Sequence, residues 1–152
     1  MKQIVLAITL IIFASCAKND IETVDYVAKN EQEITEYITT NKLTATRTNT
    51  GLYYVVTEEG TGEKPIATSN VTVVYKGSFI NGNVFDKSTD AGYTTSLQNV
   101  IRGWTEGVTY FKEGGKGLLL IPAHLGYGSY TRNGIPGGSV LIFEINLLSI
   151  NK

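Results

Sequence analysis

Hydrophobic and polar positions follow two different periods along the chain. Between Asp25 and Asn41 the apolar residues recur at helical spacing, with acidic residues between them. These apolar residues are Tyr26, Val27, Ile34, Tyr37 and Ile38. Asn30, followed by the acidic turn Glu31-Gln32-Glu33, is typical of a helix start. The pattern therefore predicts a helical extension over residues 25–42, formed by one helix or by two with Asn30 capping the second.

Beyond this helix the period changes to two, which is typical of strands. The pattern alternates over residues 52–57, β-branched side chains fill residues 71–75, and a hairpin turn is expected at Asn81-Gly82. Apolar runs over residues 118–121 and 140–148 predict two further buried strands. The sequence thus predicts five or six strands, most of them antiparallel.

One short helix is expected among these strands, over residues 103–111. Trp104, Val108 and Phe111 recur at i, i+4 and i+7 and form one apolar stripe, and Gly114 is placed to end the helix. Because this stripe needs a sheet to cover, the sequence predicts an α+β fold. In that fold a curved antiparallel sheet of five to six strands wraps one short helix, with the helical extension at the N-terminus.

Length, charge and composition narrow the functional classes. The chain has 152 residues, enough for one compact domain with an apolar core. Its net charge is −1, so no electrostatic attraction to nucleic acid is expected. With one histidine and one cysteine, the sequence offers no metal-ligand cluster, and no cofactor is expected. The histidine, His124, follows a predicted strand and is interpreted as an exposed loop residue in preference to a catalytic one.

The first residues are typical of a bacterial export signal. Lys2 precedes an apolar run over residues 4–13, shorter than the roughly 20 residues that a membrane-spanning helix needs. The run ends in Phe13-Ala14-Ser15-Cys16, which resembles a lipobox with Cys16 as the lipidation site. We therefore expect a signal peptide over residues 1–15, a tether over 16–24, and a chain lipid-anchored to a bacterial membrane in the cell envelope, outer membrane favoured, facing the periplasm or the surface. The alternative is a plain secretory signal with an incidental cysteine.

Aromatic residues remain as candidates for function. Six of them lie on different predicted elements, and from periodicity alone such residues belong to a core: Tyr75, Phe85, Tyr93, Trp104, Tyr127 and Phe143. Several short motifs contain them or lie next to them, in the order Val74–Gly77, Asn81–Asp86, Val100–Gly107, Ile121-Pro122, Gly126–Gly128, Ile135-Pro136 and Leu141–Glu144. In this order and spacing, residues 71–149 resemble the FKBP family of macrolide-binding prolyl isomerases. The resemblance implies an FKBP-like isomerase domain over residues 43–152.

The resemblance also implies a role for each site residue. It makes Trp104 the pocket floor, and it implies wall positions for Tyr75, Phe85, Tyr93 and Phe143. Further lining is implied for Val100, Ile101 and Ile135, with the backbone N–H of Ile101 offered to a ligand carbonyl. Asp86 falls where the family has a buried carboxylate, and Tyr127 where it has a phenol that bonds the bound peptide. The alternatives are a structural hydrogen bond for Asp86 and a half-buried surface tyrosine for Tyr127.

The implied activity is peptidyl-prolyl cis/trans isomerisation of proteins that fold outside the cytoplasm. An aromatic pocket withholds water from the planar amide and so favours its twisted transition state, without nucleophile, metal or cofactor. The expected partners are proline-containing polypeptides and macrolide inhibitors, with membrane contact through the lipid anchor only. The alternative is a non-catalytic FKBP-like chaperone or adaptor of a cell-envelope complex. The helical extension then becomes a partner-binding or dimerising arm, whereas otherwise it packs on its own domain.

Overall fold

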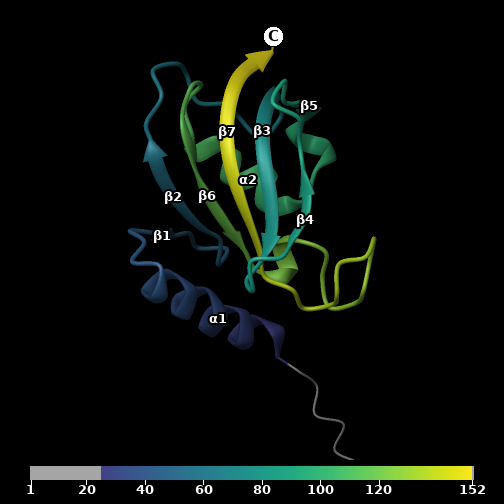
Figure 1. The fold of residues 1–152 in the computed structure, drawn as a ribbon. Coiled ribbons are helices and arrows are strands. Elements are labelled where there is room, and N and C mark those ends of the chain that lie inside the picture. The colour runs from purple at the N-terminus through teal and green to yellow at the C-terminus, as the bar shows by residue number, and fades with distance from the viewer. Residues whose placement is uncertain (1–24, 152) are drawn as a thin grey trace, which may run out of the picture.

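The computed structural model describes residues 25–151 and shows one antiparallel sheet of seven strands with two helices beside it (Figure 1). The strands are β1 (Thr46–Arg47), β2 (Tyr53–Glu58), β3 (Asn70–Phe79), β4 (Val84–Lys87), β5 (Tyr93–Ser96), β6 (Lys116–Ile121) and β7 (Leu141–Asn151). The helices are α1 (Tyr26–Thr40) and α2 (Arg102–Gly107), with 3-10 turns η1 (Leu97–Asn99), η2 (Val108–Tyr110) and η3 (Ala123–Leu125). The predicted α+β fold is confirmed. The predicted signal peptide, tether and Cys16 lie outside the described residues.

Two long strands, β3 and β7, form the middle of the sheet. They pair antiparallel from Asn70 opposite Asn151 to Phe79 opposite Leu141. The strand order is β1-β2-β6-β7-β3-β4, and β5 also pairs with β3. Two short strands therefore share the outer edge of β3, which brings the sheet to seven strands instead of five or six. The predicted turn at Asn81-Gly82 joins β3 to β4, with the Gly82 N–H donating to the Phe79 carbonyl.

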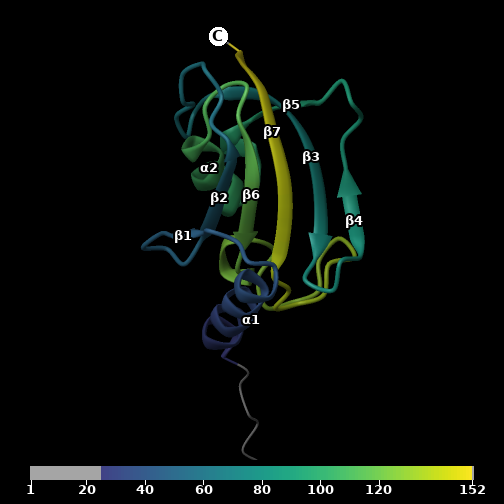
Figure 2. The same ribbon diagram turned by 60° about the vertical axis from the view of Figure 1, so that its left-hand side comes forward.

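Helix α2 lies against one face of the sheet and buries its apolar stripe there (Figure 2). The helix ends at Gly107 and continues as the η2 turn, so Trp104 lies on α2, Val108 on η2 and Phe111 directly after η2, and all three are buried. Glycines on α2 allow close approach to β6, because a Cβ at Gly103 would overlap the Ile121 side chain, and one at Gly107 would overlap Leu119. This close contact between α2 and β6 fixes the position of Trp104 relative to the sheet.

Helix α1 crosses one end of the sheet, near the end of β6 and the start of β7 (Figures 1 and 2). The Asp25 side chain caps the helix by accepting from two backbone N–H groups. Ile34 packs in a second apolar cluster with Tyr53, Val55, Leu120 and Val140. The extension is therefore one helix packed on its own domain. No helix within residues 25–151 is long and apolar enough to cross a membrane.

The structure selects the one-helix alternative for the extension and also shows which of its apolar residues are buried. Asn30 does not cap a second helix; it lies inside α1 and is fully buried. Val27 does not join the buried stripe, since 61% of it is exposed. Both differences arise because the helix packs on a sheet end and on loops rather than along a continuous apolar surface.

Candidate active site

Side chains from both sheet and helix converge on a cavity of about 430 Å³ beside α2. Its lining consists of Tyr75, Phe85, Asp86, Tyr93, Asn99, Val100, Ile101, Trp104, Gly126, Tyr127, Arg132, Asn133 and Phe143. All the residues for which the sequence suggested a pocket role line this cavity except Ile135. Ile135 lies instead in the apolar core, 5% exposed. Its backbone pairs with Arg132 across a tight turn, which buries the isoleucine and leaves Arg132 exposed.

Four rings form the base of this cavity and are called here the aromatic cup: Tyr75, Phe85, Trp104 and Phe143. The Trp104 ring meets Tyr75 at a centroid distance of 5.1 Å and 87°, and Phe143 at 5.3 Å and 85°. Phe85 meets Phe143 at 5.6 Å and 87°. These are edge-to-face contacts, the arrangement that the ring quadrupoles favour. The rings thus contact one another and still border open space.

The strand register explains how the cup forms. Gly77 on β3 lies opposite Phe143 on β7 and opposite Asp86 on β4. A Cβ at Gly77 would come within 2.7 Å of Phe85 and 2.8 Å of Phe143. The glycine after Val74-Tyr75-Lys76 therefore makes room for two rings of the cup.

The indole of Trp104 carries a polar atom without a partner. The residue is 4% exposed, and its Nε1 is the one buried side-chain nitrogen or oxygen within residues 25–151 that makes no hydrogen bond. A buried donor left unpaired costs about 1–3 kcal/mol, so native structures contain few of them. The base of the cup is thus not optimised for stability alone.

A hydrogen bond fixes the polar side of the cup. The Tyr75 hydroxyl donates to Asp86 Oδ2 at 2.7 Å, and the Lys87 backbone N–H donates to Asp86 Oδ1 at 2.8 Å. Burial, and then the hydrogen bond to Asp86, raises the pKa of Tyr75 well above its usual range, so the phenol stays protonated as a donor. The resemblance implied a buried carboxylate, but Asp86 is exposed because it lies on the short edge strand β4.

The backbone before α2 presents a free donor to the cavity. The Ile101 carbonyl accepts from the N–H groups of Trp104 and Thr105 and so begins the helix. The Ile101 N–H itself donates to no described residue. Val100 and Ile101 are both half-buried and line the cavity. The cavity is thus lined by a residue whose backbone N–H has no acceptor among residues 25–151.

Sequence reasoning missed the polar rim of the cavity, formed by Asn99, Arg132 and Asn133. Asn133 and Gly134 both have positive φ, 52° and 78°, as a tight two-residue turn requires. This turn places Arg132 at the cavity, where it has no ion-pair partner within the described residues. The Asn-Gly pair is a hairpin signal that could have located the turn, although not its position over the pocket.

Other candidates lie away from this cavity. His124 is exposed, as expected, and its Nε2 lies 2.9 Å from the Thr50 carbonyl. Within residues 25–151 no group of three or more His, Cys, Asp or Glu side chains could hold a metal ion. A depression of about 470 Å³ on the opposite face of the sheet is bordered by the ion pair between Lys76 and Glu144. An ion pair offers an apolar ligand less apolar contact surface than the aromatic rings of the cup do.

Comparison with known proteins agrees with this geometry. Residues 61–148 match the family model described as FKBP-type peptidyl-prolyl cis-trans isomerase. The FKBP-type isomerase FkpA of Buchnera aphidicola subsp. Schizaphis graminum is 50% identical over 110 residues, which cover 70% of this chain and 43% of that protein. The chain therefore spans less than half the length of this relative.

Two solved structures share the fold. The crystal structure of FkpA from Escherichia coli matches with a TM-score of 0.71 and 41% identity, covering 82% of this chain and 60% of that one. A peptidyl-prolyl cis-trans isomerase from Pseudomonas syringae pv. tomato matches with a TM-score of 0.75 and 28% identity, covering 84% and 94%. The matched family segment contains the whole aromatic cup, and the family suggested by the sequence motifs is confirmed. The chain belongs to the FKBP-type peptidyl-prolyl cis-trans isomerase family.

Proposed function

We propose that the chain is a peptidyl-prolyl cis/trans isomerase that acts on Xaa-Pro bonds in the aromatic cup. The observation that carries this proposal is the open cavity of about 430 Å³ with the Trp104 ring at its base. A prolyl ring is apolar and compact, and faces and edges of aromatic rings are suitable walls for it. Had these rings filled the space among themselves, the proposal would have no site.

The cup favours rotation through desolvation. The barrier to Xaa-Pro rotation is about 20 kcal/mol, because rotation breaks amide resonance. The planar amide carries more separated charge than the twisted one, so water stabilises the ground state more. Replacing water with the Trp104, Phe85 and Phe143 rings removes part of that stabilisation, and only the difference between the two states accelerates the reaction.

Polar groups at the cup orient the peptide in this proposal. The Ile101 N–H is free to donate to a carbonyl next to the prolyl ring. Asp86, held by Tyr75 and the Lys87 N–H, fixes negative charge at the β4 edge of the cup. Tyr127 is half-buried at the cavity and would supply a phenol to the bound peptide. Each of these groups would restrict the orientation of the bound peptide, and the aromatic rings would desolvate its amide.

We further propose that the protein acts on polypeptides folding in the cell envelope and is anchored there through a lipid on Cys16. The sequence supports this by its short apolar run followed by Ala14-Ser15-Cys16. Macrolides that imitate a prolyl ring would compete with substrate for the cup. Mass spectrometry of the mature protein tests the anchor, since a mature N-terminus other than a lipidated Cys16 would exclude it.

The proposed activity is tested by isomerisation of a proline tetrapeptide by the purified chain, with and without a macrolide. We expect acceleration over solvent, inhibited by the macrolide. Asp86→Asn should lower kcat/KM about tenfold or more, because hydrogen bonds to charged groups contribute roughly 1.5–3 kcal/mol and about 1.4 kcal/mol is tenfold.

The matched control is Asp90→Asn, which removes a nearby exposed carboxylate that does not line the cup. Its kcat/KM should equal that of the unsubstituted chain. No acceleration by the unsubstituted chain would favour the non-catalytic chaperone or adaptor instead. Equal activity of Asp86→Asn and Asp90→Asn would remove Asp86 from the mechanism.

A further inference from the structure

Asn30 is the one polar or charged residue within residues 25–151 that is buried, and its exposure is 0%. It lies in the second turn of α1, where a polar side chain normally faces water. Burying an amide without partners costs several kcal/mol, so its hydrogen bonds show what the position requires. Its neighbours on that side of the helix are loops, not the apolar cluster around Ile34.

Three hydrogen bonds use both ends of this amide. Asn30 Oδ1 accepts from the Ala123 backbone N–H at 2.8 Å, and Asn30 Nδ2 donates to the Gly138 carbonyl at 2.9 Å. Nδ2 also donates to Glu33 Oε2 on the same helix at 3.0 Å. Ala123 and Gly138 lie 93 and 108 residues further along the chain. The side chain therefore joins two segments that α1 does not otherwise pair with through hydrogen bonds.

These contacts close a ring of hydrogen bonds. The Gly128 N–H donates to the Ala123 carbonyl at 2.8 Å, and the Gly138 N–H donates to the Gly128 carbonyl at 2.9 Å. With the two bonds of Asn30, the circuit runs through Ala123, Gly128 and Gly138 and back to Asn30. We call these four residues the α1 junction. Each member is linked to the next one, so removing Asn30 opens the circuit.

The α1 junction lies at the base of residues 126–138, called here the pocket loop. This loop carries Gly126, Tyr127, Arg132 and Asn133, all of which line the candidate active site. Outside the junction the loop is held by apolar contacts, because Ile135 is buried in the core and Tyr127 packs against that core. Ser129 to Gly134 are exposed, so the position of the polar rim at Arg132 and Asn133 depends most on how the base of the loop is held.

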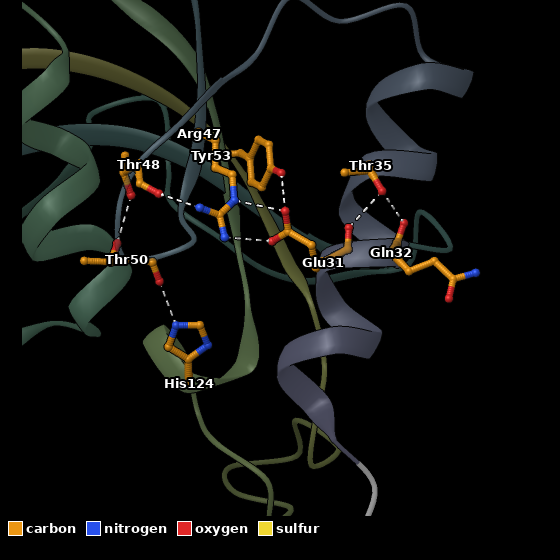
Figure 3. Close-up of polar contacts among 8 residues, drawn as sticks. All are labelled: Glu31, Gln32, Thr35, Arg47, Thr48, Thr50, Tyr53 and His124. Carbon is orange, nitrogen blue, oxygen red and sulfur yellow. Dashed lines mark hydrogen bonds and ion pairs between the residues drawn. The ribbon is translucent and has the colours of Figure 1, made fainter.

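Helix α1 is also attached elsewhere, so the contact of Asn30 can be tested separately from helix docking. Glu31 accepts from Arg47 Nε at 2.9 Å and from the Tyr53 hydroxyl at 2.7 Å (Figure 3). Ile34 is fully buried against β2 and β6. Both anchors bind α1 to the sheet and neither touches the pocket loop, so they hold the helix when Asn30 is replaced.

We propose that Asn30 is a positioning residue for isomerisation, and that α1 is a working part of the active site instead of a spacer. The amide holds the pocket loop so that Tyr127, Arg132 and Asn133 meet the bound peptide. This inference rests on the proposed isomerase function. Because loop contacts form in the bound ground state as well as in the transition state, loss of Asn30 should act mainly on KM.

The test compares Asn30→Ala with Tyr53→Phe, which removes a hydrogen bond of the same helix at a site remote from the pocket loop. We expect Asn30→Ala to raise KM for a proline tetrapeptide about tenfold, with kcat changed far less, because two loop hydrogen bonds are lost. Tyr53→Phe should leave both constants within about twofold. Amide hydrogen exchange at Gly128 and Gly138 should accelerate in Asn30→Ala only.

A second variant covers the case in which Asn30→Ala does not fold. Asn30→Asp keeps the acceptor for the Ala123 N–H, but its carboxylate cannot donate to the Gly138 carbonyl. When protonated, the same carboxyl can donate again. Its KM relative to that of the unsubstituted chain should therefore fall as the pH is lowered from about 8 to about 5, since burial beside the Gly138 carbonyl and the Glu33 carboxylate raises the pKa of a carboxyl at this position.

The outcomes separate the two proposals. Unchanged KM and unchanged exchange in Asn30→Ala would overturn the positioning role while leaving the isomerase function intact. An inactive unsubstituted chain would remove the function. Amide exchange would then still decide whether Asn30 holds the pocket loop, and unchanged exchange would overturn that as well.

Discussion

The aromatic cup is built on the sheet and α2, and the α1 junction is built from α1 and the loops beyond the end of the sheet. The two regions differ in whether their buried polar groups are hydrogen-bonded. In the cup, Trp104 Nε1 is buried without a partner and the rings leave a cavity of about 430 Å³. In the junction, both ends of the Asn30 amide are bonded and no exposed surface remains on that residue. The cup, which would receive a ligand, keeps an open cavity and an unpaired donor. The junction, which supports the cup, has no free space and no unpaired donor on Asn30.

This difference gives stability and function a different relation in each of the two regions. Closing the cup with larger side chains would gain apolar contacts and lose the site, which is the usual conflict between stability and activity. The junction has no such conflict, because every hydrogen bond it makes also stabilises the fold. Substitutions in the cup can therefore remove activity while the variant is still folded, whereas substitutions in the junction should weaken stability and substrate binding together.

The largest effect is expected from Trp104→Ala. Removing a buried tryptophan costs about 3–5 kcal/mol of stability, and here it also removes the base of the cup. The free energy of unfolding should fall by that amount in urea, and isomerisation should be lost at temperatures where the variant is folded. Phe111→Ala is the matched control: Phe111 lies on the same stripe, 1% exposed, and does not line the cavity. It should lose similar stability and keep its activity when folded. Retained activity in Trp104→Ala would contradict the role of the cup.

The fold was largely predictable because its central elements carry strong periodic patterns. The runs that became β3, β6 and β7 are apolar and β-branched, and their burial on the sheet follows directly. The short edge strands are different. β1 has two exposed residues, and β5 (Tyr93–Ser96) has no buried residue. Such strands form because a neighbour offers unpaired backbone groups, which no local pattern records.

The candidate site divides in the same way. The aromatic residues of the cup stand in recognisable motifs, so the sequence suggested them before the structure brought them together. Arg132 and Asn133 stand in a loop whose position depends on contacts at its base. Asn30 was a candidate helix cap in the two-helix alternative because asparagine favours caps, while its actual partners lie 93 and 108 residues away. Contacts between residues so far apart in the sequence leave no local signal in it.

An intermediate effect is expected at the α1 junction from Gly138→Ala, with Gly134→Ala as control. Both glycines have positive φ, 76° and 78°, so alanine meets the same backbone strain of about 1 kcal/mol at either position. A Cβ at Gly138 would overlap the Tyr26 ring, whereas at Gly134 nothing lies within 4 Å. Gly138→Ala should therefore lose about 1–3 kcal/mol more in the free energy of unfolding. Equal losses in the free energy of unfolding would mean that Tyr26 of α1 does not pack closely against Gly138 at the base of the pocket loop.

The smallest effect concerns the charged anchor of α1. The hydrogen bond from Arg47, and then the one from Tyr53, lower the pKa of Glu31 below its ordinary value. A carboxyl whose folded pKa is depressed stabilises the fold above its unfolded pKa, about 4.3, and this contribution is lost as the pH falls through the folded pKa. The Glu31 side chain is 39% exposed, so solvent screening limits the contribution to below about 1 kcal/mol.

Glu31→Gln should therefore lower the free energy of unfolding more at about pH 7 than at about pH 3, because the contribution of the carboxylate diminishes as the pH falls below the unfolded pKa. Glu36→Gln is the control, since Glu36 lies on the same helix and forms no ion pair within the described residues. A loss for Glu31→Gln that is equal at both pH values would show that shape, not charge, matters at this anchor. Asn30 and Ile34 would then remain as the contacts that hold α1 against the pocket loop and the sheet.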